Sequence, residues 1–592
     1  MQDSTVEKEA EAKHGAPDPI STGTRARDDG AEIEKSASRE TKAKADSDSN
    51  SISDTASTYS HFEEIHVPSR PPSRAISHTV SEVRDGIESR RDLDLEQGQL
   101  AEEEKNPIAA ATAPDPGDPN LVTWTGPDDP ENPKNWVFSK KWGAVFIVST
   151  FTLISPVSSS MVAPSLTAIG AELDIPEPFQ QNIVLSIFVL AFALGPLAWG
   201  PLSEIYGRVI VLQLTNLGFF AFNLGCGFAR TKGQLIAFRF LAGLGGSASL
   251  AIGGGVLGDL FVAEERGRAM SMYSLAPLLG PAIGPIAGAF ITENTTWRWA
   301  FYATSIADAA IQGAGLFFLR ETYAPLLLDR KRRLRTKESG NAALRTPYDT
   351  AGRSSVWATL KVAMTRPFRL VATQIIVQSI ALYMMFVYGL MYLMLASFPA
   401  LFTSPPPAGY GMSTGLGGLN YISLGLGFFL GAQVCAPLQD RIYISLKRRY
   451  GGGTVGRPEF RVPMMFPGAF LVPVGLLVYG WTAEYKTHWI GPNIGAMLFA
   501  AGAIIGFQCL QGYLVDTYQR YAASAVGAAT VLRSLAGFGF PLFAPSMYDR
   551  LGYGWGNTLM AFLGIAIGWP SPLLLWKYGE TLRKRSPFAA GG

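Results

Sequence analysis

The 592-residue sequence holds few of the residues that bind metals or form disulfides. Its three cysteines, Cys226, Cys435 and Cys509, lie inside apolar stretches without metal-ligand spacing, so a disulfide framework is not expected. Four of the five histidines precede residue 80, and the fifth, His488, lies in an expected loop. No histidine is therefore placed inside an apolar stretch, where it could relay protons or ligate a metal. We expect no metal site and no cofactor.

Motifs for nucleotide chemistry and nucleophilic catalysis are also missing. The glycine runs 243–246 and 253–255 lie inside an apolar segment and lack the strand context that a dinucleotide site requires. There is no ATP-binding motif and no nucleophile elbow, which argues against a primary pump and against an enzyme. The net charge of +2 sums a mixed-charge tail and basic loops, and we expect no nucleic-acid partner.

Charged residues make up only 17% of the chain, and they are unevenly distributed. Residues 1–139 are rich in Ser, Asp, Glu, Lys and Arg and have little apolar periodicity. Such a composition buries too little surface to offset chain entropy, so this tail is predicted to be disordered. Its last part, from Trp124 to Trp136, is rich in proline and Asx turns, and we expect it to lie on the membrane surface.

The rest of the chain is dominated by apolar segments of the ~20 residues needed to cross a ~30 Å hydrocarbon core. Twelve such segments are predicted, at residues 143–165, 180–201, 209–229, 233–257, 270–291, 299–319, 370–402, 413–436, 463–482, 491–515, 523–547 and 555–577. The sequence thus predicts an all-α membrane protein of twelve transmembrane helices. It divides into six-helix bundles at 140–320 and 370–580, a cytoplasmic linker at 321–369 and a cytoplasmic C-terminal tail at 581–592.

Lysine and arginine in the connections predict the orientation. With a cytoplasmic N-terminus, the inside loops hold most of these residues, and both termini face the cytosol. The outside loops then hold only Arg230, Lys232, Arg298, Lys486 and Arg550. The sequon at Asn294 falls in a short outside loop, where it would be a glycosylation acceptor.

The fifth apolar segment combines glycine and proline unusually. Gly280, Gly284 and Gly288 recur every fourth residue, so they share one helix face, and Pro281 and Pro285 lie beside them. A face of small residues lets another helix approach closely, and we expect this stripe to let the two bundles seal against each other. An ordinary tightly packed membrane helix is the alternative.

Charged residues near or inside the apolar segments are the other candidates for function. Arg239 and Asp308 lie among apolar neighbours, where a charge is costly. Glu204, Arg208 and Asp259 are placed at the cytoplasmic mouth, where they are expected to form a charge cluster. The alternatives are an arginine that extends its charge to the outer surface and an ordinary surface salt bridge.

Three of these features carry a family resemblance. The loop Gly200-Pro-Leu-Ser-Glu-Ile-Tyr-Gly-Arg208 resembles the major facilitator superfamily signature G-x-L-a-D-r-x-G-r, although Val209 stands at the usual final basic position. Arg239 resembles the helix-4 motif R-x-x-x-G. The glycine stripe resembles the antiporter motif G-x-x-x-G-P-x-x-G-G, with Ala289 replacing its last glycine. The chain is similar to fungal twelve-helix drug:proton antiporters of the multidrug, polyamine and cycloheximide-resistance type.

The resemblance implies a monomeric secondary exporter of amphipathic small molecules, driven by proton antiport through alternating access. It implies a multi-pass protein of the cell membrane, with the vacuolar membrane as the alternative, and we favour Asp308 as the proton carrier. Polar candidates for the substrate cavity between the halves are Gln181, Asn182, Tyr273, Ser274, Gln378, Tyr383, Tyr388, Gln508 and Gln511. The aromatic ones among them are also compatible with core or lipid-facing positions. The competing functions are a proton-coupled nutrient importer of the same fold and a membrane receptor or enzyme.

Overall fold

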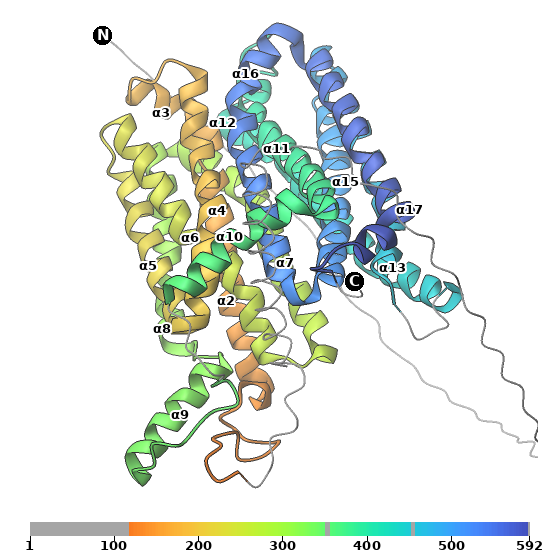
Figure 1. The fold of residues 1–592 in the computed structure, drawn as a ribbon. Helices are drawn as coiled ribbons and strands as arrows, with labels where there is room; N and C mark the ends of the chain where they lie inside the picture. Colours follow the sequence, from red (N-terminus) through yellow and green to blue (C-terminus); the bar gives the residue numbers. More distant parts are fainter. Residues whose placement is uncertain (1–117, 350–355, 451–455, 590–592) are drawn as a thin grey trace, which may run out of the picture. The chain divides into compact units, whose positions relative to one another are not determined.

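A computed structural model describes residues 118–349, 356–450 and 456–589, which belong to one compact unit (Figure 1). The disorder predicted for residues 1–117 lies outside the described residues. Within the described part, β pairing is limited to an isolated bridge between Leu121 and Arg345, and the remaining elements are helical. The all-α fold class is confirmed.

The chain forms two sets of long helices joined by a helical linker. The first half contains α2 (Phe138–Ser160), η2 (Ala163–Ser165), α3 (Leu166–Glu172), α4 (Pro178–Tyr206), α5 (Arg208–Gly227), α6 (Lys232–Leu260), α7 (Ala263–Asn294) and α8 (Trp297–Phe318). The linker carries α9 (Ala324–Ser339) and α10 (Val356–Thr373). The second half contains α11 (Ile375–Thr403), α12 (Thr414–Leu419), α13 (Ile422–Tyr450), η3 (Pro458–Met464), α14 (Met465–Glu484), α15 (Ile490–Thr517), η4 (Gln519–Tyr521), α16 (Ala522–Gly568) and α17 (Pro570–Lys584).

These helices account for the twelve predicted spans. By length and composition, ten helical stretches of the described residues can cross a membrane. The longest, Ala522–Lys584, is two spans, because α16 reverses direction at Gly552, whose φ of 69° is outside the helical region. The predicted sixth span corresponds to the 22-residue helix α8, which is not among these ten stretches. The prediction of twelve helices in two halves is confirmed.

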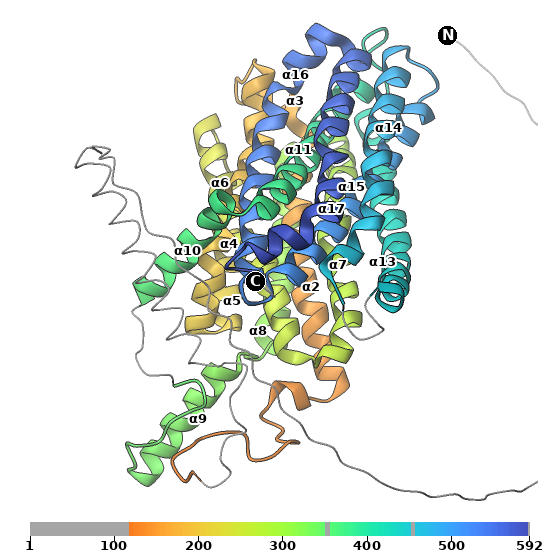
Figure 2. The same ribbon diagram turned by 45° about the vertical axis from the view of Figure 1, so that its right-hand side comes forward.

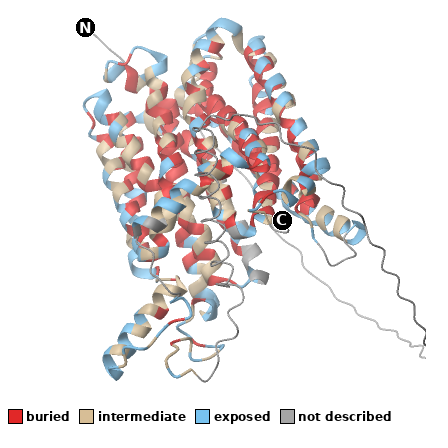
Figure 3. Ribbon diagram, viewed as in Figure 1, coloured by how far each residue is buried: buried red, intermediate tan, exposed pale blue. Residues whose placement is uncertain are grey.

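Apolar side chains cover much of the outer helix surfaces. Large exposed side chains include Leu214 and Leu217 on α5, Phe317 on α8, and Trp555 and Phe562 on α16. In Figure 3 the buried residues run along the facing sides of the helices. An apolar outer surface of this extent is costly in water and stable in a lipid bilayer.

The glycine face of α7 is filled by a helix of its own half. A Cβ at Gly280 would lie 2.5 Å from the Cβ of Pro156 in α2, and one at Gly284 would lie 2.5 Å from the Val157 carbonyl oxygen. A Cβ at Gly288 would overlap the carbonyl oxygen of Met161. The glycine stripe was expected to pack between the two halves. It packs instead against α2 of its own half, so that expectation is wrong about the partner helix. The glycines bring α7 into backbone contact with α2, whose own Pro156 lies at this contact.

The opposite face of α7 meets the second half. Gly418 of α12 faces Ala289 and Gly425 of α13 faces Ala282, so closely that a Cβ added to either glycine would collide with the methyl group of the facing alanine. At the end of this contact, Glu293 accepts a hydrogen bond from the backbone N–H of Gly415 at 2.8 Å. Elsewhere α4 of the first half packs along α16 of the second, and Figures 1 and 2 show these two helices side by side. Small residues on both partners thus set the spacing of the halves.

The segment before α2 packs on the linker, although residues up to 139 were predicted to be disordered. Its place on the membrane surface stays a prediction. The N–H of Val122 donates to the Arg345 carbonyl at 2.8 Å, and the Arg345 side chain pairs with Asp118 at 2.7 Å. Lys331 of α9 reaches Asp129 at 3.3 Å. From residue 118 onward, contacts to a segment about two hundred positions away order the chain, which its local composition does not reveal.

Candidate functional site

The turn between α4 and α5 depends on one glycine and one distant glutamate. Gly207 adopts a φ of 107°, which ends α4 and allows α5 to begin at the next residue. The first N–H groups of α5 have no partner within the helix. Glu321, after α8, is the acceptor for two of them. Its carboxylate accepts hydrogen bonds from the N–H groups of Arg208 at 3.0 Å and Val209 at 3.2 Å. A negative charge at this position also complements the helix dipole.

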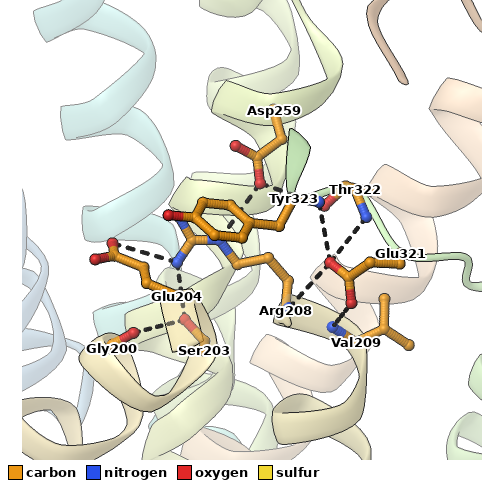
Figure 4. A network of polar contacts seen from close by, with 9 residues as sticks. All are labelled: Gly200, Ser203, Glu204, Arg208, Val209, Asp259, Glu321, Thr322 and Tyr323. Carbon is orange, nitrogen blue, oxygen red and sulfur yellow. Dashed lines mark hydrogen bonds and ion pairs between the residues drawn. The ribbon is translucent and has the colours of Figure 1, made fainter. Parts of the chain in front are cut away.

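Arg208 gathers the predicted charge cluster (Figure 4). Its Nε lies 3.3 Å from Asp259 at the end of α6, and its Nη1 lies 3.6 Å from Glu204. Its guanidinium carbon is 4.8 Å from the centre of the Tyr323 ring. The structure thus brings the three predicted residues together and joins α4, α5 and α6 to the segment that follows α8.

Glu321 was missed as a member of this cluster. It also accepts from the N–H groups of Thr322 at 3.0 Å and Tyr323 at 2.9 Å, so one carboxylate organises two chain segments. The available signal was an acidic residue immediately after the sixth apolar segment, followed by Thr-Tyr-Ala-Pro. The sequence separation of more than one hundred residues concealed its partner.

Arg239 is fully buried and caps the end of another helix. Its Nη1 and Nη2 donate to the carbonyls of Ser158 and Ser159 at 2.9 Å each, where α2 ends. Its Nε donates to the Val184 carbonyl of α4 at 3.2 Å. The last carbonyls of a helix lack partners and carry the negative end of its dipole. Arg239 therefore holds α2 and α4 together without an ion pair to any described carboxylate, and its charge does not reach the surface.

Asp308 lies halfway along α8 and is fully buried. Its Oδ1 accepts a hydrogen bond from Nδ2 of Asn216 in α5 at 3.0 Å. Its Oδ2 has no hydrogen-bond partner among the described residues. The same Asn216 amide also donates to Gln312 at 2.9 Å, so the carboxyl group belongs to a polar seam between α5 and α8.

The sequence analysis did not identify the rest of this seam. Asn223, on the same face of α5 as Asn216, donates to Thr304 and Ser305 of α8 at 2.9 Å each and accepts from Ser158 of α2 at 2.7 Å. The signal was a helical spacing of polar residues in two otherwise apolar segments: Asn216 and Asn223 in one, Thr304, Asp308 and Gln312 in the other. We call the set Asn216, Asn223, Thr304, Ser305, Asp308 and Gln312 the polar seam.

An aromatic group on α11 connects the halves. The Ser159 hydroxyl lies 3.2 Å from the hydroxyl of Tyr392, so α2 and α11 touch next to the carbonyl that Arg239 binds. The Tyr392 ring packs on Tyr388 with centroids 5.2 Å apart. Tyr388 in turn faces Phe507 of α15 at 6.0 Å and the guanidinium of Arg533 in α16 at 5.2 Å.

The remaining predicted cavity residues are dispersed. Gln181 donates to the Ile175 carbonyl in the loop before α4, and Asn182 next to it is buried. Ser274 bonds to Met270 of its own helix, and Tyr273 donates to the Ser249 carbonyl inside the first half. Tyr383 is buried within the second half, Gln378 and Gln511 are exposed, and Gln508 is half-buried. Of the predicted cavity residues, Tyr388 thus lies in the aromatic group that joins the halves. Asn294, the predicted glycosylation acceptor, is exposed at the end of α7.

Metal chemistry has no support in the part of the chain that the structure describes, since no group of three or more His, Cys, Asp or Glu could hold an ion there. Two six-helix halves with an apolar exterior, intramembrane charges and a polar contact between them define a multi-pass membrane transport protein. The chain belongs to the Major Facilitator Superfamily, which it matches over residues 148–541. It is therefore a transporter rather than an enzyme, as predicted.

Similar proteins show which kind of Major Facilitator Superfamily transporter this chain resembles. The chain is 49% identical to the efflux pump vrtL of Penicillium aethiopicum over 518 residues, which cover 86% of this chain and all of that protein. It is 42% identical to the efflux pump radE of Floropilus chiversii over 486 residues, 81% of this chain and 88% of that one. The xylose transporter XylE from E. coli, in a partially occluded inward-open conformation, superposes with a TM-score of 0.54 at 14% identity, over 74% of this chain and 98% of that one. The predicted kinship with fungal efflux transporters is confirmed, and the likeness to XylE shows the fold.

Proposed function

We propose that this transporter exports amphipathic small molecules from the cell in exchange for protons. Export is supported by the names of its relatives, two of which are efflux pumps similar along almost their whole length. Proton coupling rests on Asp308, a fully buried carboxyl group halfway along a membrane helix with an oxygen that no described residue binds.

The geometry around Asp308 suits a proton carrier. Oδ1 is held by the Asn216 amide, so a proton arriving at the group binds to Oδ2 without displacing a protein donor. A neutral acid and a carboxylate both remain compatible with that amide, because an N–H donor serves either form. The polar seam extends from Gln312 past Asp308 to Asn223 and, through Ser158, to the end of α2, where Ser159 touches Tyr392 of the other half.

The contacts between the halves support alternating access. The α7 contact with α12 and α13 uses alanine and glycine, with one carboxylate-to-backbone hydrogen bond at its end. Such a surface separates without leaving large buried side chains exposed. The Arg208 cluster, at the opposite ends of the helices, ties the first half to the linker and stabilises one of the two access states.

The same proposal includes the location of the protein. The excess of lysine and arginine in alternate connections supports an orientation with both termini in the cytosol. The membrane is the plasma membrane or, alternatively, the vacuolar membrane. The first half closes on the second within a single chain, and we propose that the transporter acts as a monomer.

Inside-out vesicles containing the full-length protein test this function. The probes are three molecules with one fluorophore: dansylglycine, an anion; dansylglycinamide, which is neutral; and dansylcadaverine, a cation. An acidic vesicle lumen should drive accumulation of at least one probe. Asp308→Asn should abolish the gradient-driven part while exchange of probe between equal pH values persists, because the binding site is intact.

Asp549→Asn is the matched control, since Asp549 is an exposed carboxylate of α16. It should behave as the wild type. Gradient-driven accumulation that survives Asp308→Asn would remove Asp308 as the carrier. Wild-type flux that follows protons in the same direction would make the protein an importer instead.

A further inference from the structure

The described part of the chain contains an arginine in the membrane that neither the charge cluster nor the polar seam uses. Arg533 lies eleven residues after the start of α16, about 16 Å along a helix that rises 1.5 Å per residue and so near the middle of the bilayer. It is half-buried. An arginine at this depth remains charged and is costly unless something binds it.

Neighbouring residues of α16 place Arg533 at the junction of the two halves. Two positions earlier, Val531 packs on Ala193 and Leu197 of α4. One turn later, a Cβ at Gly537 would lie 3.0 Å from both Val189 of α4 and the Tyr388 ring. Arg533 lies one turn before Gly537 and its guanidinium faces the Tyr388 ring of α11, so it is next to this contact between the halves.

Three other buried or half-buried arginines show what a structural arginine needs. Arg239 donates to carbonyls of α2 and α4, and Arg208 pairs with Asp259 at 3.3 Å. Arg583, in the second half, pairs with Glu459 at 3.2 Å. Each charge is compensated by several acceptors or by a carboxylate.

Arg533 lacks this compensation within the described residues. Its guanidinium lies 5.2 Å from the centre of the Tyr388 ring, and its buried Nε has no acceptor. The ring face offsets part of the charge, by an amount on the order of 1–2 kcal/mol. The Nε–H is thus left without an acceptor among the described residues, and a planar guanidinium can bind a carboxylate with two parallel hydrogen bonds.

We propose that Arg533 anchors an anion subsite at the junction of the two halves, and that the cargo is an apolar small molecule carrying one carboxylate or a similar negative charge. This assignment rests on the proposed export function, which it makes more specific. The guanidinium binds the acid group, and Tyr388 and Phe507, whose rings meet edge to face at 6.0 Å, contact the apolar body. Tyr392 carries the contact on to Ser159 of the first half, so a bound anion touches a group shared by both halves.

Binding measurements on the purified full-length protein test the subsite independently of transport. Wild type should bind dansylglycine at least about tenfold more tightly than dansylglycinamide or dansylcadaverine, since only the acid can take the bidentate pair. Arg533→Gln should remove this preference and leave the weaker binding of the amide unchanged. Arg533→Lys keeps the charge but loses the fork, and should retain part of the preference.

Arg550→Gln, the same substitution at an exposed arginine of α16, should leave the preference intact. The subsite is overturned if the wild type shows no preference for the acid, or if Arg533→Gln weakens all three probes equally. Acid-selective binding that Arg533→Gln removes, combined with no gradient-driven uptake of any probe, would support the subsite and contradict the proposed export. The two proposals therefore fail separately.

Discussion

The two halves of the molecule fill their interiors in different ways. In the second half, one continuous apolar cluster extends from Leu370 to Leu575 and includes Val189 of the first half. Its buried tyrosines, among them Tyr383 and Tyr479, are part of that cluster. The first half has several smaller apolar clusters, and Arg239 and most of the polar seam are also buried in it.

This difference in the interiors gives the two halves different physical properties. A continuous apolar core resists deformation, because each side chain is fixed by close neighbours. A buried polar network has specific partners that change with a proton or a charge. Under the proposed function, the second half is the stiffer frame that presents Tyr388, Tyr392 and Arg533, and the first half contains Asp308, the proposed proton carrier.

The corresponding turns of the halves also differ. Pro201-Leu-Ser-Glu204 and Pro437-Leu-Gln-Asp440 follow corresponding spans. After the first, Gly207 ends the helix, and Arg208 binds its carboxylate partners. After the second, α13 continues as a helix to Tyr450, since no glycine follows at the equivalent place. One glycine therefore decides whether the repeat forms a charged turn or a longer helix.

The largest effect is expected from removing the arginine that caps α2. Arg239→Met leaves the Ser158, Ser159 and Val184 carbonyls without their donor, and each buried unsatisfied group costs about 1–3 kcal/mol. We expect a loss of more than about 3 kcal/mol, seen as a large fall in Tm in detergent. In the second half, Tyr383→Phe removes a buried hydroxyl that has no partner among the described residues and should change Tm little. Equal losses in both variants would contradict the division between the halves.

A smaller effect is expected at the contact between α7 and α2. Gly288→Ala places a methyl group on the Met161 carbonyl oxygen, which is backbone and cannot rotate away, and overpacking of this kind costs about 1–3 kcal/mol. Tm and the amount of protein in the membrane measure it. Gly539→Ala in α16 is the control from the second half, because nothing lies within 4 Å of its added Cβ, and it should be neutral or slightly stabilising. A neutral Gly288→Ala would show that the backbones of α2 and α7 do not touch.

The smallest effect concerns the segment that joins the first half to the linker. Burial raises the pKa of Asp129, but hydrogen bonds from Thr125, Glu131 and Lys331 outweigh it and hold the pKa well below its ordinary value of 3.8. A carboxyl group whose pKa is lowered on folding stabilises the fold above its unfolded pKa, and that contribution is lost as the pH falls through the lower folded value. Docking of residues 118–135 on α9 should thus persist at neutral pH and weaken progressively below about pH 4.

Hydrogen exchange of residues 118–135 measures this docking, with Asp129→Asn compared at each pH so that intrinsic exchange rates cancel. The wild type should be better protected above pH 4, and the two proteins should converge as the pH is lowered. A difference that stays constant across the pH range would show that the carboxylate is not what holds the segment.

Local features of the sequence were enough for the helices and for some of the site. Apolar runs of the right length determine twelve spans, because a backbone in lipid must satisfy its own hydrogen bonds. The glycine and charge motifs placed Arg208, Asp259 and Asp308 correctly at helix ends or within a helix. Which distant residues the buried charged groups contact was decided by the tertiary structure alone. It brought Glu321 to the start of α5, Arg239 to the end of α2, and Arg533 to Tyr388. Hydrogen-bond geometry and close packing act across any sequence separation, so periodicity along the chain contains no record of them.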